Sequence, residues 1–466
     1  MEAITLSHVR IPSINIGGIC LPGIGAPGSI GKKGLIWPTG MKEHIKAWYD
    51  PKKQGMTNYD VIESYAEDFT YWTLDNTGIT STPKKIVIPA GTELKYIIAF
   101  RGFNSFTDGF HIKYTGNAVI TYRYNKEDGT VGTIAINESG IYHLPASVRT
   151  QKNFGFYCNP QTVTEETTIE QLPTSILKDL SGNGNHAYLY GGKGKLNSGM
   201  GVYKFDFLSD LLINSAYLPY TERQYDSICS LAGHPNGWLF QYKSLTDIPT
   251  FKIEVKGIVN DKFHYRWYDE NGNRGVDFVI DKDGIYEFPM SYSVETNTGV
   301  GIVCNNICQD NVCFTQIPDY PNQLCYDGKM YAVCYGFPIL TDYTVMAERT
   351  WFENNGNRVF ITKGNIWPNC AFVFEKINAS LDSETFSFSK STRIDDLRSK
   401  SGVTYQTKQS YNGVPIAVGD SSDGDVLLIG GQKSGEYIGC HSAIIVADRS
   451  FTEEEINWLK QNWDKI

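Results

Sequence analysis

Phe110-His-Ile-Lys-Tyr-Thr-Gly116 decides how this chain is organised, because it recurs as Phe251-Lys-Ile-Glu-Val-Lys-Gly257. Two further stretches recur in the same order and at nearly the same spacing: Gly140-Ile-Tyr-His-Leu-Pro145 matches Gly284-Ile-Tyr-Glu-Phe-Pro289, and Phe154-Gly-Phe-Tyr-Cys-Asn159 matches Val300-Gly-Ile-Val-Cys-Asn305. Apolar and polar residues alternate in Phe110–Thr115 and in Phe251–Lys256, which is typical of half-buried strands. A repeat this widely spaced predicts a duplicated small β-sandwich domain and not a solenoid, whose periods are roughly 20 to 50 residues.

The rest of the chain is also rich in strand signals. Short β-branched or aromatic stretches such as Val426-Leu-Leu-Ile429 are separated by Gly, Asn and Asp turns. Glu127-Asp128-Gly129 and Glu270-Asn271-Gly272 predict hairpin turns, in which Gly supplies the positive φ. One helix is predicted near the end, where Thr452-Glu-Glu-Glu455 forms a capping box and the apolar face runs to Trp463. The sequence therefore predicts an all-β chain with a short C-terminal helix.

Length and composition restrict the class of protein. The 466 residues suggest about three domains. The formal net charge is -9 without a basic cluster, and this excludes a nucleic-acid partner, because phosphates require Lys and Arg. No stretch approaches the roughly 20 apolar residues of a membrane helix, and the N-terminus lacks the charged and apolar regions of a secretory signal. We therefore expect no membrane partner and no export by the general secretory route.

The metal-ligating residue types form no recognisable motif. Ten cysteines are present, none in the C-x2-C spacing of a zinc site. Without a signal peptide, free buried thiols are expected, and a disulfide framework is the alternative. The histidines have no close partner at ligand or triad spacing, and His234 is one of them. Asp420-Ser-Ser-Asp-Gly-Asp425 is a turn that could hold a structural calcium ion, although it lacks the final Glu of an EF-hand loop. No other cofactor is expected.

Residues 1–44 are predicted to form an extended arm. Gly25, Gly28, Gly31 and Gly34 recur at every third position, and Trp37 follows them. Four such glycines are too few for an independent collagen helix. Two interpretations stay open: a flexible tail, or an arm that orders along a partner and anchors the protein there.

Four segments outside the repeats share features of one known fold: Ile45-Lys-Ala-Trp-Tyr-Asp50, Leu177-Lys-Asp-Leu-Ser-Gly-Asn-Gly-Asn-His-Ala-Tyr-Leu-Tyr-Gly191, Tyr326-Asp-Gly-Lys-Met-Tyr-Ala-Val333 with Leu340-Thr-Asp-Tyr-Thr-Val-Met-Ala347, and Ala443-Ile-Ile-Val-Ala-Asp-Arg-Ser-Phe-Thr-Glu-Glu-Glu-Ile-Asn-Trp-Leu459. They resemble the opening strand, the D-x-S-G-N-G-N turn, the later strands and the strand-to-helix ending of concanavalin A-like lectin/glucanase domains of the laminin-G type. The resemblance implies a two-layer β-sandwich, or jelly roll.

The repeat and the resemblance together predict the domain organisation. Residues 45–82, 174–243 and 323–466 are expected to form one discontinuous lectin-like β-sandwich. Residues 83–173 and 244–322 are expected to be inserted β-domains, because insertions enter where strand ends lie close together.

No catalytic constellation is recognisable in the sequence. The E-x-D-x-x-E string of glucanases on this fold, a G-x-S-x-G elbow and a Walker loop do not occur. We therefore predict a protein that is not an enzyme. Five aromatic residues are candidates for ligand binding, with core packing as the alternative for each: Tyr122, Tyr124, Trp238, Tyr265 and Trp267. Tyr265 and Trp267 share one strand face, and Trp238 is predicted on a loop tip.

The resemblance also implies a biological setting. Related domains occur in virion structural proteins of tailed phages, including the crAss-like phages. It implies a head fibre, tail fibre or decoration protein in the virion, made in the host cytoplasm. Such a protein would bind other virion proteins through its arm, form homo-oligomers and contact host-surface glycans. The alternatives are a bacterial cell-surface glycan-binding protein and a divergent glycan hydrolase or lyase.

Overall fold

A computed structural model shows an all-β chain, as predicted. The structure describes residues 14–16, 19–21, 35–57, 61–102, 108–148, 153–191, 194–195, 219–223, 227–242, 247–293, 299–351, 358–364, 372–376, 383–387, 393–397, 401–411, 414–415, 424–431 and 437–466. Within these ranges, most strands belong to three pairs of sheets, each with its own buried cluster.

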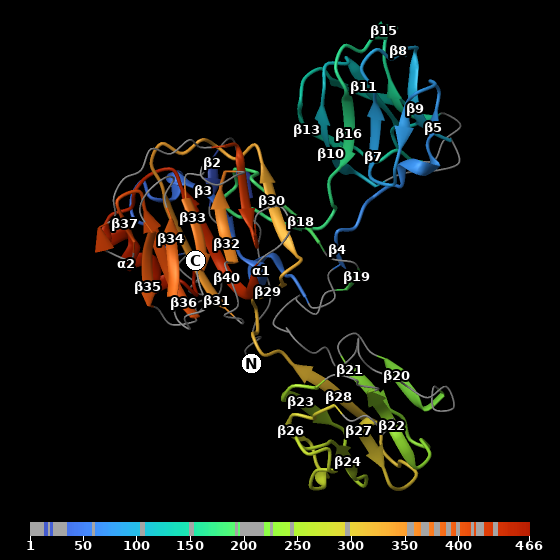
Figure 1. The fold of residues 1–466 in the computed structure, drawn as a ribbon, viewed down its shortest axis with the longest axis vertical. Coiled ribbons are helices and arrows are strands. Elements are labelled where there is room, and N and C mark those ends of the chain that lie inside the picture. The colour runs from blue at the N-terminus through green and yellow to red at the C-terminus, as the bar shows by residue number, and fades with distance from the viewer. Residues whose placement is uncertain are drawn as a thin grey trace. The chain divides into compact units, whose positions relative to one another are not determined.

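The first sheet pair lies between Thr73 and Gln171 (Figure 1). One sheet has the order β13 (Gly140–Leu144), β10 (Phe110–Thr115), β16 (Thr167–Gln171), β7 (Lys85–Ile88) and β6 (Thr80–Ser81). The other has the order β12 (Val131–Ile136), β11 (Ile120–Asn125), β14 (Phe154–Tyr157), β9 (Ile97–Arg101) and β5 (Thr73–Leu74). Side chains of both sheets form one buried cluster, so the sheets pack face to face.

The second sheet pair lies between Thr221 and Ile317. One sheet has the order β20 (Thr221–Arg223), β21 (Ser227–Ser230), β28 (Val312–Ile317), β23 (Phe251–Lys256) and β26 (Gly284–Phe288). The other has the order β22 (Gly237–Tyr242), β27 (Val300–Cys304), β24 (Phe263–Arg266) and β25 (Phe278–Ile280). A second buried cluster fills the space between them.

The internal repeat of the sequence is visible in the strand pairing of these two sheet pairs. β10 pairs with β13 so that Phe110 faces Leu144, and β23 pairs with β26 so that Phe251 faces Phe288. The orders β13-β10-β16-β7 and β26-β23-β28-β21 correspond, as do β12-β11-β14-β9 and β25-β24-β27-β22. Equivalent positions can therefore be compared between the two sheet pairs.

The long sheet pair is built from segments far apart in the sequence. One sheet has the order β17 (Ile176–Leu177), β18 (Ala187–Tyr190), β30 (Tyr331–Tyr335), β39 (Val426–Ile429), β32 (Arg358–Lys363), β33 (Phe372–Lys376), β34 (Ser383–Ser387) and β35 (Arg393–Leu397). The other has the order β29 (Leu324–Asp327), β40 (Ile438–Ala447), β31 (Thr344–Trp351), β36 (Ser401–Thr407), β37 (Ser410–Tyr411) and β38 (Val414–Pro415), and β3 (Ile45–Tyr49) also pairs with β40. Both sheets contribute to one buried cluster.

The turn that follows Leu177 ties β3 to β18. The Asp179 carboxylate accepts hydrogen bonds from the backbone N–H groups of Trp48, Ser181 and Asn185, at 3.0, 2.9 and 3.0 Å. The side-chain amide of Asn183 donates to the Ile45 carbonyl oxygen at 2.7 Å. These polar groups bond to local backbone, so the turn has a structural role.

The remaining elements are short. They are the pairs β1 (Ile14–Ile16) with β2 (Ile19–Leu21), β4 (Val61–Ile62) with β19 (Gly194–Lys195) and β8 (Glu93–Leu94) with β15 (Gln161–Thr162), the 3-10 helices Lys42–His44 and Phe69–Tyr71, and the α-helices α1 (Pro51–Gln54) and α2 (Glu453–Asn462). The capping box of α2 is confirmed, since Glu455 N–H donates to the Thr452 hydroxyl and Thr452 N–H donates to the Glu455 carboxylate. Neither α-helix is both long and apolar enough to cross a membrane.

Free buried thiols, as expected, account for six described cysteines, and one pair forms a disulfide instead. Cys229 on β21 and Cys313 on β28 are opposite each other and are bonded. The sequence could not show this pair, because 84 residues separate its members. Six described cysteines are free and buried: Cys158, Cys304, Cys308, Cys325, Cys334 and Cys440.

Candidate functional site

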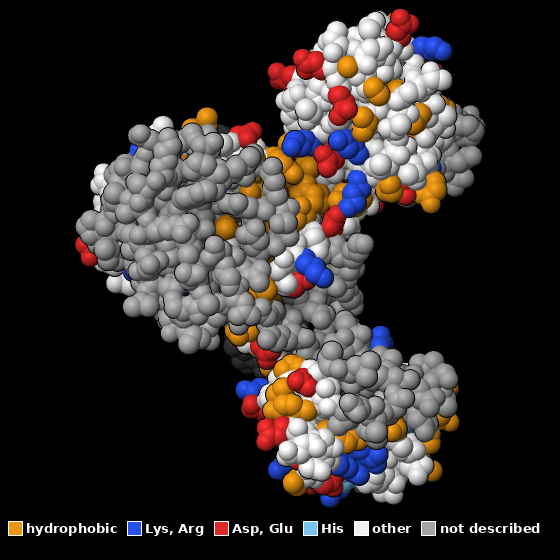
Figure 2. All heavy atoms as spheres, in the orientation of Figure 1, with side chains coloured by type: hydrophobic (Ala, Val, Ile, Leu, Met, Phe, Trp, Pro, Cys, Tyr) orange, Lys and Arg blue, Asp and Glu red, His pale blue; other side chains and the backbone are white. Residues whose placement is uncertain are grey.

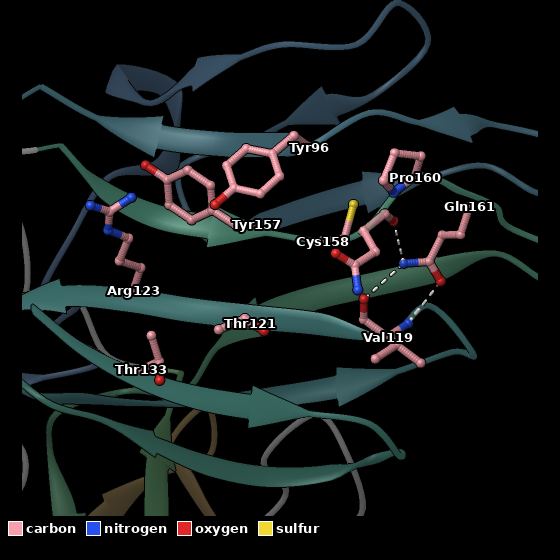
Figure 3. Close-up of a pocket in the computed structure, with 10 residues that line it drawn as sticks. Tyr96, Val119, Thr121, Arg123, Thr133, Tyr157, Cys158, Pro160 and Gln161 are labelled. Atoms are coloured by element: carbon pink, nitrogen blue, oxygen red, sulfur yellow. Dashed lines mark hydrogen bonds between the residues drawn. The ribbon is translucent and has the colours of Figure 1, made fainter.

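The outer face of one sheet in the first sheet pair is hollowed. Along β11, Ile120 and Tyr122 are buried in the core, whereas Thr121 and Arg123 point to the opposite face. A cavity of about 460 Å³ lies on that face. It is lined by Tyr96, Val119, Thr121, Arg123, Thr133, Tyr157, Cys158, Asn159, Pro160 and Gln161 (Figure 3).

Two tyrosine rings and a guanidinium group form one side of the cavity. The Tyr96 side chain is 60% exposed, and its ring centroid lies 5.7 Å from that of Tyr157 at an interplanar angle of 59°. The Arg123 guanidinium carbon lies 5.6 Å from the Tyr157 ring centroid (Figure 3). Flat apolar ring faces beside a fixed cation suit a ligand that has both C–H surfaces and oxygen atoms.

The opposite side of the cavity is held by a side-chain amide. Gln161 donates from Nε2 to the carbonyl oxygens of Val119 and Asn159, at 2.8 and 3.3 Å, and its Oε1 accepts from Val119 N–H at 3.0 Å (Figure 3). These bonds fix the amide plane. The loop after β14 is thereby joined to the start of β11.

Two titratable groups of the cavity have raised pKa values. Burial raises the pKa of the Tyr157 hydroxyl, although the Arg123 charge opposes that shift. Burial likewise raises the pKa of the Cys158 thiol, with the Gln161 amide opposing. The cavity therefore offers hydroxyl and amide groups together with one guanidinium, which match a polyol or an anionic sugar.

Glycine is required at position 155 on β14, in the sheet that carries the cavity. It faces both Arg123 and Phe100 in the sheet and has φ +156°. A Cβ atom there would lie 2.3 Å from the Ala99 carbonyl oxygen, well inside van der Waals contact. Gly301 occupies the equivalent position in the second sheet pair, where a Cβ would lie 2.3 Å from the Phe240 carbonyl oxygen.

The second sheet pair repeats the stacked arginine. Arg266 faces Gly301 as Arg123 faces Gly155. Its guanidinium carbon lies 5.0 Å from the Trp238 ring centroid. The Nε atoms of both arginines are buried and have no hydrogen-bond partner within the described ranges. The two arginines thus occupy equivalent positions in their sheets, and each lies against an aromatic ring.

The five aromatic candidates lie in different environments. Tyr122 and Tyr265 are 0% and 1% exposed, so these two predictions are corrected: strand alternation turns their rings into the cores. Tyr124 and Trp267 are partly buried and pack against the same clusters. Trp238 lies on β22 instead of a loop tip, because Gly237 already pairs with Cys304 on β27.

Other predicted sites fall largely outside the described residues. The four glycines of the predicted arm lie outside the described residues: Gly25, Gly28, Gly31 and Gly34. Four of the six residues of the calcium candidate Asp420–Asp425 also lie outside them. Trp37 is described, and its ring centroid lies 5.0 Å from that of Trp458 on α2.

Acidic and basic side chains are mixed on the described surface. On the face shown in Figure 2, Lys and Arg side chains lie in small groups beside Asp and Glu side chains. No extended basic area is visible among the coloured residues of that face.

Comparison with known proteins identifies no family. No protein-family model matches the chain, and no curated protein matches it. Similar solved structures include Trypanosoma rangeli sialidase in complex with sialic acid, with 9% identity over 84% of this chain and 86% of that chain and a TM-score of 0.25. The same sialidase with the inhibitor DANA gives 10% identity over 88% and 90%, with a TM-score of 0.25.

The prediction that the protein is not an enzyme is contradicted by this comparison, because the similar structures named above are those of an enzyme, a sialidase. The absence of a familiar motif is weak grounds for such an exclusion, since carboxylates from distant segments can meet in the fold. The TM-scores are too low for the likeness to assign this chain the sialidase fold or activity.

Proposed function

We propose that the protein is a structural and recognition protein of a phage virion, a head fibre, tail fibre or decoration protein that contacts host-surface glycans. The observation that carries the recognition role is the cavity beside Tyr96, Arg123 and Tyr157 on the outer face of a β-sheet. The virion setting is supported by the resemblance of residues 45–50, 177–191, 326–347 and 443–459 to domains found in such proteins.

We further propose the finer architecture that this function needs. The long sheet pair is a concanavalin A-like jelly roll, and the first and second sheet pairs are β modules inserted into it. Support comes from β40, which pairs with β3, β29 and β31, and from the isolated bridge between Tyr49 and Asp179. Two modules on one chain would raise avidity for a repeated surface ligand.

The chemistry of the cavity supports a glycan ligand. Sugars present C–H faces that pack on exposed rings such as Tyr96, and hydroxyl groups that accept from a guanidinium. Arg123 lines the cavity, so its guanidinium can donate to ligand oxygen atoms. A carboxylate-bearing sugar would form the stronger, charge-assisted bond.

A glycan array with the full-length chain tests the recognition role. We expect binding that falls about tenfold or more in Tyr96→Ala and in Arg123→Ala, the loss of one stacking or charged contact. Tyr71→Ala is a matched control, because Tyr71 is 68% exposed, lies 5.4 Å from the Arg101 guanidinium carbon and does not line the cavity. Equal binding by all variants, or no binding to any glycan, would reject the cavity as the site.

The virion assignment is tested separately. Residues 1–44 are proposed to anchor the chain to other virion proteins, and copies are proposed to assemble as homo-oligomers. Antibodies against the recombinant chain should label purified particles of the source phage under the electron microscope. A chain that lacks residues 1–34 should no longer attach to particles stripped of the protein. Unlabelled particles would remove the virion assignment, whatever the glycan array shows.

A further inference from the structure

Three metal-ligating side chains meet in the second sheet pair. His234 lies in the turn after β21, Cys304 is the last residue of β27, and Cys308 lies in the loop that follows. Their ligand atoms all lie within 4.8 Å of one another. This corrects the sequence interpretation, in which His234 had no partner, because the fold closes a separation of 70 residues.

The three side chains are buried and held by backbone hydrogen bonds. Their exposed fractions are 0% for His234, 4% for Cys304 and 3% for Cys308. Cys308 N–H donates to the His234 carbonyl oxygen at 2.9 Å, and Gly233 N–H donates to the Cys308 carbonyl oxygen at 2.7 Å. Cys304 is fixed between two strands, since it pairs with Gly237 on β22 and with Phe263 on β24. The cluster is therefore preorganised.

The spacing of the ligand atoms fits a tetrahedral zinc ion. Zinc bonds of about 2.3 Å to sulfur and about 2.0–2.1 Å to nitrogen place two such ligands about 3.6 Å apart. Cys304 Sγ lies 3.7 Å from His234 Nδ1. The Cys308 thiol accepts from the Ser230 hydroxyl at 3.6 Å, and its sulfur lies within 4.8 Å of the Cys304 sulfur. All three side chains can bind one ion once the His234 ring has given up its hydrogen bond to the Pro235 carbonyl oxygen.

We propose that His234, Cys304 and Cys308 form a binding site for one thiophilic divalent metal ion of the Zn²⁺ type. Both thiols bind as thiolates, and their two protons pass to solvent as the ion enters. Nδ1 of His234 donates to the Pro235 carbonyl oxygen at 2.7 Å in this structure, so binding through Nδ1 requires the ring to leave that contact and to carry its proton on Nε2. Water or an external ligand takes the fourth position.

The first sheet pair supplies an internal control for this site. Cys158 follows β14 as Cys304 ends β27 in the repeat, Phe154-Gly-Phe-Tyr-Cys158 against Val300-Gly-Ile-Val-Cys304. The Cys158 thiol donates instead to the Lys95 carbonyl oxygen at 2.8 Å. The metal site thus belongs to one copy of the repeat, and it joins the end of β27 to the turn before Trp238.

The test uses the full-length chain purified under reducing, anaerobic conditions without chelator. We expect one zinc per chain by mass spectrometry of the metal. Titration of the chelator-treated chain with Co²⁺ should give a thiolate-to-cobalt charge-transfer band and d–d bands of tetrahedral intensity that saturate at one equivalent. Cys304→Ser, Cys308→Ser and His234→Ala should lose the bands, and Cys158→Ser should retain them.

A second readout guards against variants that do not fold. Alkylation followed by peptide mass spectrometry should find Cys304 and Cys308 protected in the metal-loaded wild-type chain and reactive after chelation, with Cys158 unchanged. Cobalt that binds without charge-transfer bands, bands that survive Cys304→Ser, or a Cys304–Cys308 disulfide in the anaerobically purified chain would each overturn the proposal.

Discussion

Acid should selectively weaken the long sheet pair through His441. This side chain is fully buried on β40, where the Tyr326 hydroxyl donates to Nε2 at 3.0 Å and Nδ1 donates to the Ser442 carbonyl oxygen at 2.8 Å. Because one ring nitrogen accepts a hydrogen bond and the other donates one, this arrangement requires the neutral imidazole. Burial lowers the pKa of His441 to about 4, from 6.5 in its ordinary state.

The size and sign of the effect follow from proton linkage. Between pH 6.5 and 4 the unfolded chain binds a proton at His441 and the folded chain does not, so stability falls as pH falls through this window. A difference of about 2.5 pKa units corresponds to about 3 kcal/mol in total, with about 2 kcal/mol lost between pH 7 and 4.5. Below pH 4 both states are protonated and no further loss arises from this group.

Hydrogen exchange of the peptide that covers β40 measures the effect, because each sheet pair can open separately in a chain of this size. His441→Gln keeps an acceptor for the Tyr326 hydroxyl and cannot titrate. We expect the ratio of wild-type to variant protection on β40 to fall about 60-fold from pH 7 to 4.5. The exposed His143, replaced by Gln, is the control and should leave the ratio unchanged. An identical ratio at both pH values would refute the reasoning.

Two further perturbations test the fold. Gly155→Ala and Gly301→Ala should each destabilise their own sheet pair by about 2 kcal/mol or more in hydrogen exchange, because the added Cβ meets a carbonyl oxygen at 2.3 Å. Gly102→Ala is the control and should be near neutral, because the space around Gly102 is open. Asp179→Ala should lower the unfolding free energy of the long sheet pair by about 3 kcal/mol, since three backbone N–H groups lose their acceptor. Unchanged protection of the β3 peptide in this variant would show that water replaces the carboxylate.

Much of the fold could be predicted from the sequence, because its signals are local. Alternating residues marked the strands, Thr452 marked the start of α2, and Gly129 and Gly272 have the positive φ predicted for their turns. The repeat could be recognised in the sequence because both copies use the same strand pairing, in which Phe110 and Phe251 occupy equivalent positions.

The sites could not be predicted in the same way, because they join residues distant in sequence. The alternation around Tyr122 already placed Arg123 on the opposite face, but Tyr157 reaches it from β14 and Tyr96 from the bend before β9. Selecting aromatic residues by type alone favoured Tyr122 and Tyr265, which fill cores.

The position of β40 in its sheet dictates when the long sheet pair can form during synthesis. β3 is translated long before its partner β40, and β29 and β31 also precede the strand with which they pair. The strands between Thr73 and Gln171, and those between Thr221 and Ile317, can pair as soon as each set is made. Nascent chains therefore carry unpaired strand edges until β40 is made, which makes premature termination before Ile438 a route to aggregation.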